Sequence, residues 1–112
     1  YIGLELAQSI YSIVLDNKAT GHTKNFNAEI ASVAKKDLKA GQKLDGEGGY
    51  CARGRLISSK RSKQERILPM GYTDNVILKK DIKKDEFISL DDVELNLPKQ
   101  IIEAREYQYN LI

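Results

Sequence analysis

The chain contains few residues of the kinds that form cross-links, bind metals or act as nucleophiles. It has 1 cysteine and 1 histidine in 112 residues. A single cysteine, Cys51, excludes an internal disulfide and fits a reducing, cytoplasmic environment. His22 has no partner at the spacing of a metal site, so we expect a loop histidine and no metal. Cys51 has no visible activating neighbour, so we expect a buried small residue.

Long apolar stretches and a strong net charge are also missing. No apolar run approaches the roughly 20 residues of a membrane-spanning helix. The start, "YIGLELAQSIYSIVLDN", lacks a basic leader, so we expect no signal peptide. A net charge of +2 is too small to indicate nucleic-acid binding by itself. Charged residues make up 30% and hydrophobic residues 41%, which is typical of a globular domain.

The N-terminal segment of the chain is predicted to form an apolar helix. Apolar residues from Ile2 to Leu15 recur at steps of three and four, which predicts a helix ending near Gly21. More than half of its surface would be apolar, so we expect it to pack against a preceding domain or a second copy. The chain also begins with Tyr1 rather than methionine, which suggests a fragment. We therefore divide it into a helix and linker over 1–22 and a domain over 23–112.

The remaining elements are predicted to be mainly β. Alternating or glycine-bounded apolar runs predict strands, whereas "SSKRSKQERILPMG" predicts a short, exposed helix that Ser58 or Ser59 caps. Ser89 and Asp92 have the spacing of a capping box on a single turn. The final segment, 100–112, fits a strand or a frayed helix equally well. Strands are expected at 26–34, 50–57, 74–80 and 93–97.

One segment of the sequence occurs twice. "AKKDLKAGQKLD" at 34–45 returns as "LKKDIKKDEFIS" at 78–89. We expect two β-turn-β elements around a pseudo-twofold axis, since neither could bury its apolar side alone. In each, an aspartate should accept hydrogen bonds from N–H groups just downstream, an apolar residue should plug the turn, and a third residue should take a positive φ. These residues are Asp37, Leu38 and Gly41 in the first copy, and Asp81, Ile82 and Asp85 in the second.

The repeat resembles a known family. "V-x-x-K-D-L-K-A-G-x-x-L", closed after its second copy by "S-x-D-D-V-E", is similar to the SAF domain, a family of β-clip fold. That family includes antifreeze-like domains, sialic acid synthase C-termini and sugar-acid dehydratase N-termini. Over residues 2–97, with "LDGEGGY" and "LPMG" as the specific pieces, the chain looks like the C-terminal part of homoserine-dehydrogenase-like NAD(P)-dependent oxidoreductases.

This resemblance implies upstream Rossmann and catalytic domains and an NAD(P) cofactor in a parent chain. No G-x-G-x-x-G follows a strand here, so we expect no cofactor in this chain and no catalytic residue. The implied role is a non-catalytic module that supports homo-oligomer assembly and the parent's substrate pocket. Two alternatives remain open, a carbohydrate- or sugar-acid-binding module and a free-standing basic binding domain.

Two groups of residues are candidates for ligand contact. The first is the glycine-rich loop with Glu47, Gly48, Gly49 and Tyr50, where glycines permit a close backbone approach. The second is Arg53 and Arg55, at the start of a basic segment that runs to Arg66 and could clamp a phosphate. The alternatives are a tight turn for the first group and a solvated surface for the second. Nucleic acid is disfavoured because no aromatic residues interleave with these charges.

Overall fold

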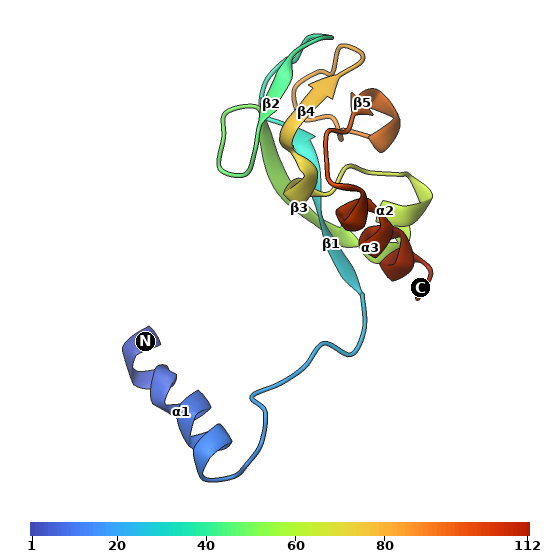
Figure 1. Cartoon of the computed structure of the whole chain (residues 1–112). Coiled ribbons are helices and arrows are strands. Elements are labelled where there is room, and N and C mark those ends of the chain that lie inside the picture. The colour runs from blue at the N-terminus through green and yellow to red at the C-terminus, as the bar shows by residue number, and fades with distance from the viewer.

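The computed structural model describes residues 1–112 as a packed body and a separate N-terminal helix (Figure 1). Helix α1 (Ile2–Val14) lies apart from the body, and a segment without helix or strand joins it to strand β1 (Ala28–Ala34). The body contains the other strands and helices. No helix of the chain is both long enough and apolar enough to cross a membrane.

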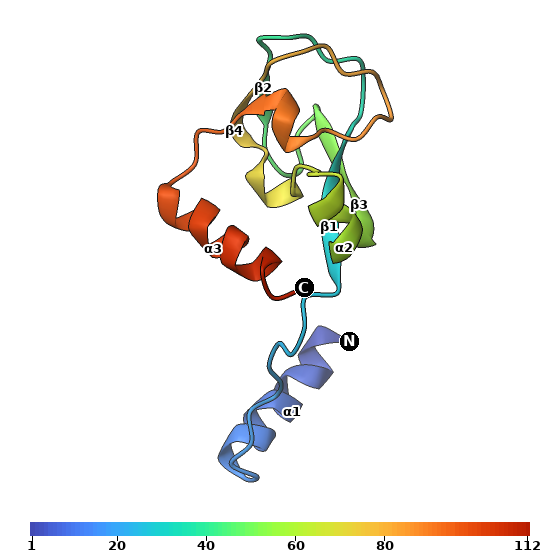
Figure 2. The same ribbon diagram turned by 90° about the vertical axis from the view of Figure 1, so that its right-hand side faces the viewer.

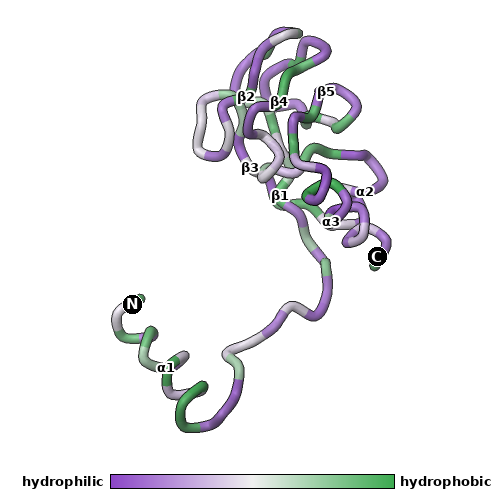
Figure 3. The backbone as a smooth tube through the Cα atoms, in the orientation of Figure 1, coloured by the Kyte–Doolittle hydropathy of each residue, from purple (hydrophilic) through white to green (hydrophobic).

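Helix α1 forms as its apolar spacing predicts, but it ends before Gly21. Asn17 takes a φ of 52°, and the N–H of Lys18 donates to the Ser12 carbonyl at 2.9 Å. This is a Schellman-type closure in which asparagine occupies the left-handed position. No residue of α1 is buried, although the helix is strongly hydrophobic (Figure 3).

Two small antiparallel sheets form the body. Strands β1 and β3 (Ala52–Ser58) pair along their whole length, from Ala28 opposite Ser58 to Ala34 opposite Ala52. Strand β4 (Asp74–Leu78) lies between β2 (Lys43–Asp45) and β5 (Val93–Glu94). Isolated bridges join β1 to segments outside the named strands, Ala31 with Pro69 and Val33 with Phe87.

The repeated turns lie side by side and bond to each other. Leu38 and Ile82 exchange backbone hydrogen bonds of 2.8 and 3.0 Å, and both side chains are buried. Gly41 and Asp85 have φ values of 80° and 69°, as the sequence predicts. The backbone of each turn therefore finds hydrogen-bond partners in the other copy.

The aspartates of the turns do not bond where the sequence predicts. Asp81 accepts a hydrogen bond from the N–H of Ala40 at 2.9 Å, and Asp37 accepts one from the N–H of Lys84 at 2.9 Å. The expectation of acceptance from residues just downstream is wrong, because each carboxylate crosses to the opposite turn. Lys39 adds an ion pair to Asp81 at 2.9 Å.

The main core lies where the two repeat copies meet. Leu38, Leu44, Val76, Ile82 and Ile88 are all at most 2% exposed. They belong to one cluster of 13 buried residues, which also draws members from β1, β3 and the segment before β4. Since both copies contribute, the burial of either depends on the other.

Short helices complete the body. Helix α2 (Ser59–Gln64) starts at Ser58, whose hydroxyl accepts from the N–H of Arg61, and its only buried residues are Ser59 and Ser62. The turn η2 (Leu90–Asp92) has the predicted capping box, formed by Ser89 with Asp92. Turn η1 (Met70–Tyr72) precedes β4, and helix α3 (Lys99–Tyr109) ends the body.

Two further expectations are not confirmed. Over the whole chain, helices hold more residues than strands, so a mainly β fold is not shown. The undecided tail is helix α3, and of the strand expected over 93–97 only two residues pair. Pro98 suits the start of the helix, since it stands just before the first turn, where its missing N–H removes no hydrogen bond within the helix.

Candidate functional site

The glycine-rich loop between β2 and β3 is organised around the carboxylate of Asp45. Its oxygens accept hydrogen bonds from the N–H groups of Tyr50 at 2.7 Å and Cys51 at 3.0 Å. A Cβ on Gly49 would lie 2.4 Å from this carboxylate, so any side chain there would force the carboxylate to move. Gly48 has a φ of 74°, which glycine adopts without strain. The hydrogen bonds to Asp45 and the two glycines together determine the backbone conformation of the loop.

The bonds to Asp45 also set its protonation. The hydrogen bond from the backbone of Tyr50 is the largest cause that lowers the pKa of Asp45 to about 2, and the Cys51 N–H acts in the same direction. Asp45 is thus an ionised structural anchor and cannot serve as a proton donor near neutral pH.

A cavity of about 350 Å³ opens beside this loop. It joins the loop to the segment "LPMGYTD", so the two specific pieces of the family resemblance meet at one place. The hydroxyl of Thr73 is buried and donates to the Met70 carbonyl at 2.7 Å. The lining residues are Asp45, Gly46, Glu47, Met70, Gly71, Thr73 and Asp74.

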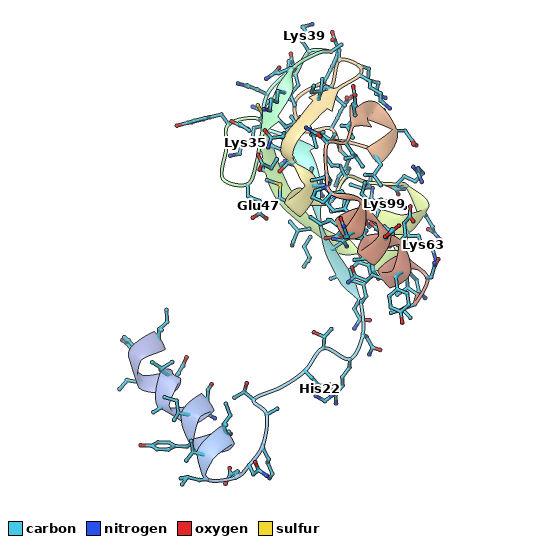
Figure 4. The ribbon with its side chains drawn as sticks, viewed as in Figure 1. His22, Lys35, Lys39, Glu47, Lys63 and Lys99 are labelled. Carbon is cyan, nitrogen blue, oxygen red and sulfur yellow. The ribbon has the colours of Figure 1, made fainter.

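The cavity is acidic. Its charged side chains are the carboxylates of Asp45, Glu47 and Asp74. Carboxylates accept hydrogen bonds from hydroxyl or amine groups and repel phosphates and carboxylates. Of the predicted contacts, Glu47 lines the cavity, and its position at the loop is visible in Figure 4. Tyr50, another predicted contact, is 83% exposed and does not line the cavity.

The arginine candidates lie elsewhere. Arg53 on β3 pairs with Asp85 at 3.0 Å, and the guanidinium of Arg55 lies 5.6 Å from the ring centre of Phe87. Neither lines the acidic cavity. The structure therefore does not bring the two candidate groups together in one site.

Other basic side chains of the segment also form ion pairs or hydrogen bonds within the chain. Arg61 pairs with Glu65 at 2.8 Å, and Arg66 pairs with Asp91 at 3.0 Å. Lys63 donates to the Tyr109 carbonyl at 2.6 Å. Because most of these charges have partners within the chain, few of them are free to clamp a phosphate.

Neither the single cysteine nor the single histidine lines the acidic cavity. Cys51 is buried, and burial is the main cause that raises the pKa of its thiol. Its sulfur accepts from Gln42 Nε2 at 3.5 Å. His22 lies on the linker between α1 and the body (Figure 4). Among all 112 residues, no three potential ligands from histidine, cysteine and carboxylates come together.

Sequence reasoning missed Asp45 and Asp74 as site residues. Asp45 lies within "LDGEGGY" and Asp74 follows "LPMG", but nothing in the pattern indicated that the loop and η1 would meet. It also missed Arg105, which α3 places beside β1, because the tail had no clear secondary structure.

Comparison with protein-family models matches the SAF domain over residues 32–94, more than half of the chain. No curated protein matches the sequence. The matched region begins in β1 and ends with β5, so it contains both repeat copies and the acidic cavity, whereas α1 and α3 lie outside it.

Proposed function

Since the chain belongs to the SAF domain family, we propose that it is a non-catalytic assembly module of a larger cytoplasmic oxidoreductase. Its resemblance to homoserine-dehydrogenase-like proteins gives the parent's class. In that parent, NAD(P) binds to an upstream Rossmann domain and catalysis belongs to a further domain. This chain contributes subunit association and one wall of the substrate pocket.

The exposed apolar surface of α1 carries this proposal. Its apolar residues Leu4, Leu6, Ile10 and Ile13 are between 53% and 80% exposed. Glu5 is the only charged side chain within the helix, so the solvated face is small. A helix this apolar is stable in water only when another surface covers it. A parent domain or a second copy supplies that cover.

The acidic cavity supports the proposed contribution of this chain to the substrate pocket of the parent. It opens on the body's surface between two motif segments, and its carboxylates are acceptors for substrate hydroxyl or amino groups. Such a surface forms one side of a pocket without supplying a nucleophile or a base–nucleophile pair.

Sedimentation of variants in α1 tests the assembly role. Leu6→Lys with Ile10→Lys places two charges on the apolar face, so the wild type should sediment as a dimer or larger species and the double variant as a monomer. Leu111→Lys is the matched control, because Leu111 is 65% exposed but lies outside α1. A wild-type monomer at high concentration would contradict self-association through α1 and leave only a parent domain as its cover.

The parent's class has its own test. The coding sequence upstream of Tyr1 should contain a G-x-G-x-x-G motif between a strand and a helix. A coding sequence without that motif would rule out the oxidoreductase parent and leave the assembly role to be judged by sedimentation.

The acidic cavity favours one alternative function, carbohydrate binding. Three carboxylates suit the hydroxyl groups of a neutral sugar better than a sugar acid, whose carboxylate they would repel. Calorimetric titration should then show heat with neutral sugars, less with hexuronates, and a weaker signal in Glu47→Gln. A flat titration at millimolar neutral sugar would dismiss this function.

We also infer that the two repeat copies are related by an approximate dyad. Val33 pairs with Phe87, and Lys43 pairs with Ile77. Adding 44 to each member of one copy gives the equivalent member of the other, so the two pairs are counterparts. The crossed aspartate bonds follow the same relation, from Asp37 to Lys84 and from Asp81 to Ala40.

A further inference from the structure

A guanidinium group from the last helix lies among three aromatic rings, two outside the helix (Phe26 and Tyr72) and one, Tyr109, on the helix itself. Arg105 of α3 lies 5.5 Å from the ring centre of Phe26, 5.7 Å from that of Tyr72 and 5.6 Å from that of Tyr109. It also pairs with Glu29 of β1. The side chains of Arg105 and Glu29 are 21% and 10% exposed, so this ion pair is largely shielded from water.

The helix that carries Arg105 has little else to hold it. No residue of α3 is buried. Besides the ring contacts, three hydrogen bonds reach the helix. Tyr72 Oη donates to the Ile101 carbonyl at 3.2 Å, Ser62 shares a hydrogen bond of 3.1 Å with Tyr109 Oη, and Lys63 Nζ donates to the Tyr109 carbonyl at 2.6 Å. Figure 2 shows α3 along one side of the body. Arg105 is the only α3 side chain that combines an ion pair with contacts to aromatic rings, so we expect it to be the main anchor of the helix.

The group of rings around Arg105 is also accessible. A cavity of about 360 Å³ lies beside Arg105, between α3 and Tyr72. Its lining includes Arg105 itself and the apolar side chains of Ile101 and Ala104. A ligand could reach Arg105 through it.

We propose that Phe26, Glu29 and Tyr72 form a guanidinium-binding site, which Arg105 fills from within the chain. Helix α3 is then a removable cover that competes with an arginine side chain of a partner protein. Three features define the ligand class: flat rings that stack on a planar cation, a carboxylate for its charge, and shielding from water. An ammonium group meets only the charge requirement.

Restoring an Arg105→Ala variant with methylguanidinium tests the site. Hydrogen exchange at amides 99–109 should be at least about 10-fold faster in the variant, because α3 loses its anchor. Methylguanidinium should bind saturably and return the exchange rate toward that of the wild type, whose site is filled. Methylammonium, with the same charge but no planar group, should bind about 10-fold more weakly or not at all.

Two further variants keep the result interpretable. Arg55→Ala removes an exposed arginine from a single ring and should create no methylguanidinium site. Glu29→Gln with Arg105→Ala leaves no unpaired buried charge; α3 should exchange fast there, and methylguanidinium should not slow it. Loss of protection throughout the body of the double variant, or no methylguanidinium binding by Arg105→Ala, would overturn the proposal.

Discussion

At the scale of single residues, the glycine-rich loop depends on a close approach between a glycine and a carboxylate. Gly49→Ala would place a methyl group 2.4 Å from the Asp45 carboxylate, which would break the bonds to Tyr50 and Cys51. We expect a loss of about 1–3 kcal/mol in the free energy of unfolding, measured by urea denaturation.

Gly71→Ala is the control, because no atom lies within 4 Å of the added Cβ. Its stability should stay within about 0.5 kcal/mol of the wild type. Equal effects at the two glycines would show that the Asp45 contacts do not define the loop.

The same carboxylate makes stability depend on pH. The folded-state pKa of Asp45 is about 2, lower than the ordinary value of 3.8, so the native state binds fewer protons than the unfolded state in that range. The stability that Asp45 contributes should be complete above about pH 5 and lost as the pH falls toward 2. Asp45→Asn should reduce the acid dependence of the unfolding free energy, and an unchanged acid limb would contradict the assignment.

At the scale of elements, the two repeated turns complete each other. Leu38 is 1% exposed and Ile82 is 2% exposed, and their backbones bond directly. Leu38→Ala and Ile82→Ala should each cost about 2–5 kcal/mol, because either cavity opens in the shared core. Leu56→Ala, at a position 69% exposed, should change stability by less than about 0.5 kcal/mol.

Chemical denaturation of these three variants also tests the dyad. If the two copies are equivalent, the losses at Leu38 and Ile82 should be similar in size. A small loss at only one of them would mean that its turn is not a counterpart of the other.

Local signals predicted most element positions but not their partners. The apolar period of α1, the Ser58 cap and the Ser89–Asp92 capping box are local patterns, and all are present. The crossed bonds of Asp37 and Asp81 join residues more than 40 positions apart. A turn motif by itself cannot distinguish a nearby N–H donor from an equivalent donor in the other copy.

At the scale of the whole molecule, α1 and the body should behave as separate units unless a partner covers the helix. The linker has no helix or strand, and Lys18 and Lys24 on it are exposed. Brief digestion with trypsin should therefore cut after these lysines first and leave the body from Ala28 onward intact. Earlier cleavage within the Lys-Lys-Asp turns would contradict this order, since hydrogen bonds hold those turns.

The sequence alone determined the duplication, the apolar helix, the glycine-rich loop and the family, because these depend on residue type and spacing within short segments. Only the tertiary structure decided three features. The aspartate of each turn accepts a hydrogen bond from the other turn, the loop meets η1 around an acidic cavity, and Arg105 lies among aromatic rings. Each of these joins residues distant in the chain, and their meeting depends on how the strands pack. For the same reason the arginine candidates, near the loop in sequence, are separate from its cavity in space.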